Sequence, residues 1–113
     1  MKNIKPQDVQ EYLEKYEDTV VIDVRTPLEW EGGIPDCAKL ELLTITPDMD
    51  MFAENLTILV PSKEHHVIFI CKGGARSATA ALLAERVGYK KCYNVQGGFE
   101  EWKALGLQVR SFK

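Results

Sequence analysis

A chain of 113 residues is the size of one domain, and we expect a single domain over residues 1–113. The apolar share of 45% is ordinary for a protein with a buried core, so the fold needs no disulfide to hold it. The formal net charge of −3 argues against a role on nucleic acid or on a membrane surface, and no apolar run approaches the ~20 residues of a membrane span.

The three cysteines are an odd number without a CxxC pair, so they do not form a disulfide framework. Free thiols fit a reducing compartment, and residues 1–6 lack the apolar segment of a secretory signal, so a cytoplasmic location is expected. His65 and His66 are expected to be solvated in a polar loop. Because they have no third ligand at metal spacing, we expect no metal and no other cofactor.

The first third of the chain predicts a helix, a strand and a helical turn. Apolar side chains in residues 6–16 recur at the spacing of an amphipathic helix. The β-branched run 19–24 is the clearest first strand. Residues 26–30 follow as a short helical turn, with Pro27 preset for its first position. Residues 32–35 then break the chain.

Helices and strands alternate in the rest of the chain. The predicted elements are a strand over 37–43, a helix with Thr46 as its N-cap, a polar loop over 61–66, a strand over 67–70, a helix from Ser77 to Gly88, a strand over 92–95, a helix over 99–105 and a short strand over 107–109. This alternation predicts an α/β fold with a mainly parallel sheet.

Three informative segments each follow a predicted strand. They are residues 23–25, 71–77 and 96–98. Sites in parallel sheets form at the carboxyl ends of strands. We therefore expect these segments to form the rim of one pocket.

The strongest functional signal is the segment Cys71-Lys72-Gly73-Gly74-Ala75-Arg76-Ser77, between a buried strand and a helix. Backbone N–H groups in a tight loop and at a helix start attract negative charge, and Lys72 and Arg76 add full charges. This setting favours the thiolate, which is the nucleophilic form of cysteine. A structural cysteine has no use for such neighbours, so we expect Cys71 to be a nucleophile.

Four segments, in order along residues 4–109, resemble signatures of the rhodanese family of sulfurtransferases. They are 21–25 with Glu29 and Trp30 (aspartate-x-arginine, then glutamate and an aromatic), 32–35 (glycine-histidine-isoleucine-proline), 71–76 (CxxGxR) and 95–102 (glycine-glycine and tryptophan). One of these motifs alone would be a weak signal. Four in the right order, on the expected secondary structure, are specific.

The resemblance implies a five-stranded, mainly parallel sheet with helices on both faces, and sulfur transfer through a persulfide on Cys71. In the family scheme, the thiolate attacks the outer sulfur of a donor such as thiosulfate and passes it to a thiophilic acceptor, cyanide in the test tube. The donor and the persulfide would be bound by Lys72, Gly73, Gly74, Ala75, Arg76 and Ser77. The expected partners are a small anionic sulfur donor and a sulfur-acceptor protein or small thiol.

Two further residues of the first signature are expected to support the site rather than react. Asp23 and Arg25 should brace the fold through hydrogen bonds and an ion pair, for example of Arg25 with Glu29. Cys92, in a predicted strand, is expected to be core.

The chain departs from the family pattern before its second strand. Gly33 stands where many relatives carry histidine, and Asp36 replaces a common glycine. Cys37 replaces a small residue, and it is either structural or a thiol that reaches Cys71.

Other functions fit parts of the pattern. Phosphatases and arsenate reductases of this fold carry five residues between cysteine and arginine, whereas this chain carries four, 72–75. One residue fewer removes up to ~3.3–3.6 Å of contour, which suits a sulfur atom better than a phosphate. A non-enzymatic interaction module would be free to lose the cysteine and its cations. A persulfide carrier for a partner enzyme remains open.

Overall fold

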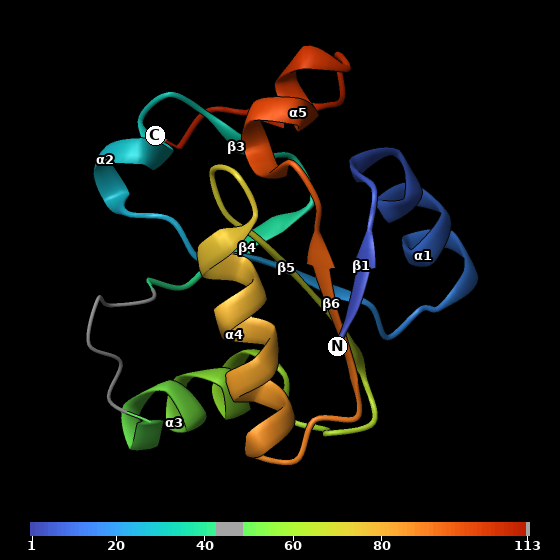
Figure 1. The fold of residues 1–113 in the computed structure, drawn as a ribbon, viewed down its shortest axis with the longest axis vertical. Helices are drawn as coiled ribbons and strands as arrows, with labels where there is room; N and C mark the ends of the chain where they lie inside the picture. The colour runs from blue at the N-terminus through green and yellow to red at the C-terminus, as the bar shows by residue number, and fades with distance from the viewer. Residues whose placement is uncertain (43–48, 113) are drawn as a thin grey trace.

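The computed structural model describes residues 1–42 and 49–112. In this part of the chain the main sheet has five strands in the order β1-β6-β5-β2-β4, and every neighbouring pair is parallel (Figure 1). The strands are β1 (Lys2–Ile4), β2 (Val20–Asp23), β4 (Ala38–Leu40), β5 (His66–Ile70) and β6 (Lys91–Val95). A separate antiparallel pair joins β3 (Ile34–Pro35) to β7 (Val109–Arg110).

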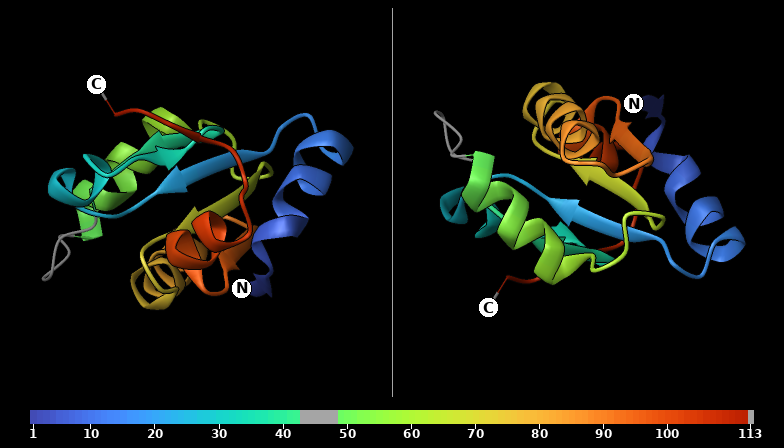
Figure 2. Two further views of the ribbon diagram at one scale, coloured as in Figure 1. Left: turned by 90° about the horizontal axis from the view of Figure 1, so that it is seen from above. Right: turned by 90° about the horizontal axis from the view of Figure 1, so that it is seen from below.

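Helices cover both faces of the sheet (Figures 1 and 2). One face packs against α3 (Met49–Leu59) and α4 (Ala75–Arg86), and the other against α1 (Val9–Lys15) and α5 (Gly98–Ala104). A 3-10 turn, η1 (Pro6–Asp8), leads into α1, and the short helix α2 (Pro27–Trp30) follows β2. The predicted fold class, a mainly parallel five-stranded sheet with helices on both faces, is confirmed.

The central strand β5 positions Cys71. All five of its residues are buried, as expected for a strand covered on both faces. Phe69 packs into the cluster under α3 and α4, whereas Ile68 and Ile70 pack under α1 and α5. Because side chains alternate along a strand, Cys71 follows Phe69 onto the α3–α4 side.

Several helix and strand boundaries in the structure differ from the predicted ones. The first strand is β1 and not 19–24, and the final strand predicted over 107–109 is observed as β7, which pairs with β3. Helix α4 begins at Ala75 rather than Ser77, because Gly74, with a φ of 109°, already serves as its N-cap. The predicted Thr46 N-cap and the end of the predicted strand 37–43 lie outside the described residues.

The prediction of a solvated His66 is wrong. His66 is the first residue of β5 and is 7% exposed. Its Nδ1 lies 2.9 Å from Asp18 Oδ1, and its ring stacks on Tyr16 with 3.8 Å between centroids. These partners precede His66 by about half the chain, so its local sequence gave no sign of them.

Candidate functional site

The sulfur of Cys71 lies in a small cradle at the carboxyl end of β5. Cys71 is 1% exposed. Its Sγ accepts a hydrogen bond from the Gly74 backbone N–H at 3.1 Å and lies 3.2 Å from Ser77 Oγ. Gly74 is the N-cap of α4 and Ser77 is in the first turn, so the start of this helix supplies both partners. Such a cradle suits a negatively charged sulfur.

The start of α5 holds the Cys71 loop from the other side. The Phe99 N–H donates to Cys71 O at 2.8 Å, and the Glu100 N–H donates to Lys72 O at 3.1 Å. A Cβ at Gly98 would lie 2.5 Å from each of these two carbonyl oxygens, so only glycine permits the close approach. Of the three segments expected to form the rim of one pocket, 96–98 packs directly on 71–77, whereas the cavity beside the loop is lined by Arg25 and Lys72 and by no residue of 96–98.

Asp23 and Arg25 are joined by buried hydrogen bonds and an ion pair next to the site. Arg25 donates to both Asp23 carboxylate oxygens at 2.8–3.0 Å, and both side chains are buried. Arg25 also donates to Gly33 O at 2.8 Å and lies over the Phe99 ring, 4.1 Å from its centroid. The suggested ion pair of Arg25 with Glu29 is wrong, because Arg25 contacts only the backbone oxygen of Glu29, at 3.3 Å.

The Glu29 carboxylate instead pairs with Arg76. The two guanidinium nitrogens of Arg76 lie 2.7 and 2.8 Å from the two carboxylate oxygens. The hydrogen bond from Arg76 lowers the pKa of Glu29 from 4.5 to about 2, and Glu29 in turn raises the pKa of Arg76. Much of the Arg76 charge is therefore neutralised by α2. Lys72, exposed on the loop, keeps its charge facing solvent.

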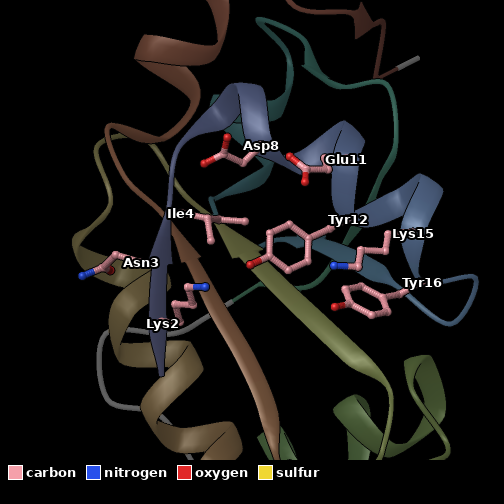
Figure 3. Close-up of a pocket in the computed structure, with 8 residues that line it drawn as sticks. All are labelled: Lys2, Asn3, Ile4, Asp8, Glu11, Tyr12, Lys15 and Tyr16. Atoms are coloured by element: carbon pink, nitrogen blue, oxygen red, sulfur yellow. The ribbon is translucent and has the colours of Figure 1, made fainter.

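A cavity of about 210 Å³ lies beside the loop. Its lining includes Lys72, Lys103, Glu100 and the Phe99 ring. A larger hollow of about 400 Å³ lies elsewhere, between β1 and α1 (Figure 3). That groove mixes acidic, basic and tyrosine side chains and has no cysteine among its lining residues, so we place the site at the Cys71 loop.

Sequence reasoning missed Asn94 as part of the site. Ser77 donates to Asn94 Oδ1 at 2.5 Å, and Asn94 Nδ2 donates to Asn3 Oδ1 at 3.0 Å. Asn94 is 5% exposed. A buried amide requires hydrogen-bond partners, so an asparagine within the predicted strand 92–95 was a signal that sequence reasoning could have used.

The other two cysteines lie away from this cradle. Cys92 is core, as predicted, and burial raises its pKa to about 11. Cys37 is half-buried and packs against the cluster under α1 and α5, on the opposite side of the sheet from Cys71. Burial raises the pKa of Cys37 to about 11, so its thiol stays protonated at neutral pH.

Among the described residues, no group of three or more histidine, cysteine, aspartate or glutamate side chains is arranged to hold a metal ion. No helix in the same part of the chain is long and apolar enough to cross a membrane.

Comparison with known proteins agrees with the fold. The model of the rhodanese-like domain matches residues 5–105, so the chain belongs to the rhodanese-like domain family. A sulfurtransferase of Allochromatium vinosum is 30% identical over 110 residues, which cover 96% of this chain and 94% of that protein.

Two solved structures with a similar fold have different functional names. The polysulfide-sulfur transferase homodimer of Wolinella succinogenes is 28% identical, with a TM-score of 0.77 over 98% of this chain and 79% of that one. A protein of unknown function from Rhodopseudomonas palustris, named as a possible tyrosine phosphatase, is 23% identical, with a TM-score of 0.79 over 97% of this chain and 85% of that one. This second likeness concerns the fold alone.

Proposed function

We propose that the protein is a sulfurtransferase that carries a sulfane sulfur as a persulfide on Cys71. The observation that carries the proposal is the cradle of Cys71, whose sulfur faces the Gly74 N–H and the Ser77 hydroxyl at the start of α4. Membership of the rhodanese-like family and the names of the two sulfur-transferring relatives support it.

The proposed reaction has two steps. The Cys71 thiolate attacks the outer sulfur of an anionic donor such as thiosulfate, the donor's S–S bond breaks, and sulfite leaves with the electron pair. A thiophilic acceptor then attacks the outer sulfur of the persulfide and releases the thiolate. Cyanide serves as acceptor in the assay. In the cell the acceptor would be a protein or a small thiol.

In this proposal, different loop residues bind different parts of the substrate and the persulfide. Backbone N–H groups between Lys72 and Ser77 would stabilise the anionic persulfide. The exposed ammonium of Lys72 would attract the charged end of the donor. Arg76, paired with Glu29, would mainly fix the position of α2 against the loop and add a weaker attraction.

A cysteine-dependent phosphatase or arsenate reductase is the competing enzyme class. Its loop would have to surround a tetrahedral oxyanion with N–H groups. Here the N–H of Gly74, three residues after Cys71, is hydrogen-bonded to the sulfur itself and is not free to bind an oxyanion. This geometry favours sulfur as the cargo. A persulfide carrier that serves a partner protein would use the same Cys71 chemistry.

The test is thiosulfate-dependent formation of thiocyanate from cyanide by the wild type and by two cysteine variants. We expect Cys71→Ser to abolish turnover, whereas Cys37→Ser, on the opposite side of the sheet, should retain it. Turnover by Cys71→Ser at the wild-type rate would overturn the proposal. A wild type that forms the persulfide from thiosulfate but turns over poorly with cyanide would favour the carrier.

A further inference from the structure

A chain of hydrogen-bonded side chains leads from the protein surface to the Cys71 sulfur. Asn3 lies opposite Asn94 in the register of β1 and β6, and its Oδ1 accepts from Asn94 Nδ2 at 3.0 Å. The Ser77 hydroxyl lies within donating distance of two acceptors, Asn94 Oδ1 at 2.5 Å and Cys71 Sγ at 3.2 Å. Ser77 and Asn94 are buried, whereas Asn3 is exposed. Figure 3 shows the Asn3 side chain pointing away from the groove beside α1.

The Ser77 hydroxyl has one proton and cannot donate it to both neighbours. While Ser77 donates to Asn94 Oδ1, its contact with Cys71 requires the sulfur to be the donor, as a thiol. A thiolate only accepts, so it needs the Ser77 proton for itself. The arrangement in which Ser77 donates to Asn94 Oδ1 therefore matches the thiol, and the arrangement in which Ser77 donates to Sγ matches the thiolate.

We propose that Asn94 and Asn3 are positioning residues that set the direction of the Ser77 hydroxyl, and that the chain reverses when Cys71 becomes an anion. An amide turned by half a turn exchanges its oxygen and nitrogen at nearly the same places. With both amides turned, Asn3 donates to Asn94 Oδ1, Asn94 Nδ2 donates to Ser77 Oγ, and Ser77 donates to the sulfur. The proton released by Cys71 passes to solvent, and the reversal moves hydrogen bonds only.

The reversal keeps every buried polar group of the chain paired in both states. Without it, the thiolate would lose the Ser77 donor, or the Asn94 oxygen would face an oxygen lone pair of Ser77. The value of this device for sulfur transfer rests on the proposed function. The reversal itself is a property of the Cys71 thiol and can be measured without any sulfur donor.

Other charged groups near the loop come from several elements and would also affect the thiolate. They are Asp23 at the end of β2, Arg25 after it, Glu29 on α2, Lys72 on the loop, Arg76 on α4, and Glu100 and Lys103 on α5. A test of the chain must leave all of them unchanged. Substitutions of the exposed residue Asn3 meet this condition, because Asn3 lies at the surface end of the hydrogen-bonded chain, away from Cys71.

Two substitutions of Asn3 favour opposite donor-to-acceptor directions of the side-chain hydrogen bonds. Asn3→Asp offers only acceptors, which keep Asn94 Oδ1 toward Ser77 and so favour the thiol. Asn3→Lys offers only donors, which turn Asn94 and favour the thiolate. The measurement is the rate of iodoacetamide alkylation of Cys71, followed by peptide mapping across pH. At pH values below the midpoint of the rate–pH profile, we expect alkylation to be roughly threefold slower in Asn3→Asp and faster in Asn3→Lys. A threefold change in rate corresponds to the free energy of one modest hydrogen bond.

Charge at position 3 could act through space with the same sign, so two controls separate the effects. At 1 M salt the screening length falls to about 3 Å, and the effect of the chain should persist. In an Asn94→Ala background the connection is cut, and both Asn3 effects should vanish. Effects that disappear in salt, survive unchanged in Asn94→Ala, or never occur would overturn the proposal. If Asn94→Ala does not fold, the salt series decides. Failure of the proposed function would show separately, as a wild type with a responsive Cys71 and no sulfur transfer.

Discussion

Glu29 and Arg76 lie 47 residues apart in the sequence, and their side chains join α2 to the start of α4 through two hydrogen bonds of 2.7 and 2.8 Å. Glu29 also accepts from the backbone N–H and the hydroxyl of Thr26, so it completes the capping box of α2. One carboxylate thus caps the start of α2 and holds an arginine in the first turn of α4. The arginine after Cys71 is therefore a structural connection as well as a charge.

The Glu29–Arg76 pair predicts a stability change at acid pH. The pKa of Glu29 falls from 4.5 to about 2 in the folded protein. A carboxyl with a lowered pKa contributes stability above its unfolded pKa, and this contribution is lost as pH falls to the folded value. Glu29→Gln keeps the Thr26 contacts but removes the charge. At pH 7 it should destabilise by at most about 1 kcal/mol, because the pair is partly exposed.

The measurement is urea unfolding of wild type and Glu29→Gln from pH 7 down to pH 2. The difference in unfolding free energy should shrink between pH 4.5 and about 2. A difference that stays constant over this range would show that the charge of Glu29 contributes nothing.

Lys72 is predicted to bind the donor rather than to assist the chemistry. A contact that is equal in the ground and transition states changes KM and leaves kcat nearly unchanged. Lys72→Ala should therefore raise KM for thiosulfate about two- to fivefold at low salt, the effect of one exposed charge contact. Lys2→Ala, a lysine of the groove in Figure 3, is the control and should leave KM unchanged. Equal effects of the two substitutions would contradict the assignment.

Gly98 is predicted to be required by contact as well as by conformation. Its φ is 56°, and an added Cβ would lie 2.5 Å from Cys71 O and Lys72 O. Gly106 is the matched control, because its φ is 72° but nothing lies within 4 Å of an added Cβ. Gly106→Ala should cost about 1 kcal/mol for the backbone alone. Gly98→Ala should cost about 2 kcal/mol more and slow Cys71 chemistry. Similar thermal unfolding and activity of the two variants would refute the role of close contact.

Loop length is predicted to set the specificity for sulfur over phosphate. A glycine inserted between Gly74 and Ala75 should move the Gly74 N–H away from the Cys71 sulfur. Thiosulfate turnover should then fall, and binding of phosphate-like oxyanions should become possible. The two assays are thiosulfate turnover and hydrolysis of a small aryl phosphate. Appreciable Cys71-dependent phosphatase activity in the wild type would favour the competing enzyme class.

The fold and the loop could be predicted because their signals are local. The β-branched run before Asp23 and the run of strand, cysteine, glycines and helix at Cys71 each show their structure within a few residues. Strand β1 was missed because only Ile4 of its three residues is buried, so it has no alternating pattern. In the described part of the sheet it is an edge strand, paired with β6.

The missed contacts of the site join residues that are distant in the sequence. The partner of Arg76 is 47 residues away, that of His66 is 48 away, and Asn94 meets Asn3 across 91 positions. No periodicity or spacing encodes such pairs. A buried polar residue in an apolar strand, such as Asn94, indicates only that a partner must exist.

The most direct test of the central claim is the location of the transferred sulfur. Intact-mass measurement after thiosulfate treatment should show one added sulfur atom, peptide mapping should place it on Cys71, and cyanide should remove it. Cys71→Ser should gain none, while Cys37→Ser should be labelled like the wild type. A sulfur atom found on Cys37 or Cys92, or retained by Cys71→Ser, would contradict the claim that Cys71 is the carrier.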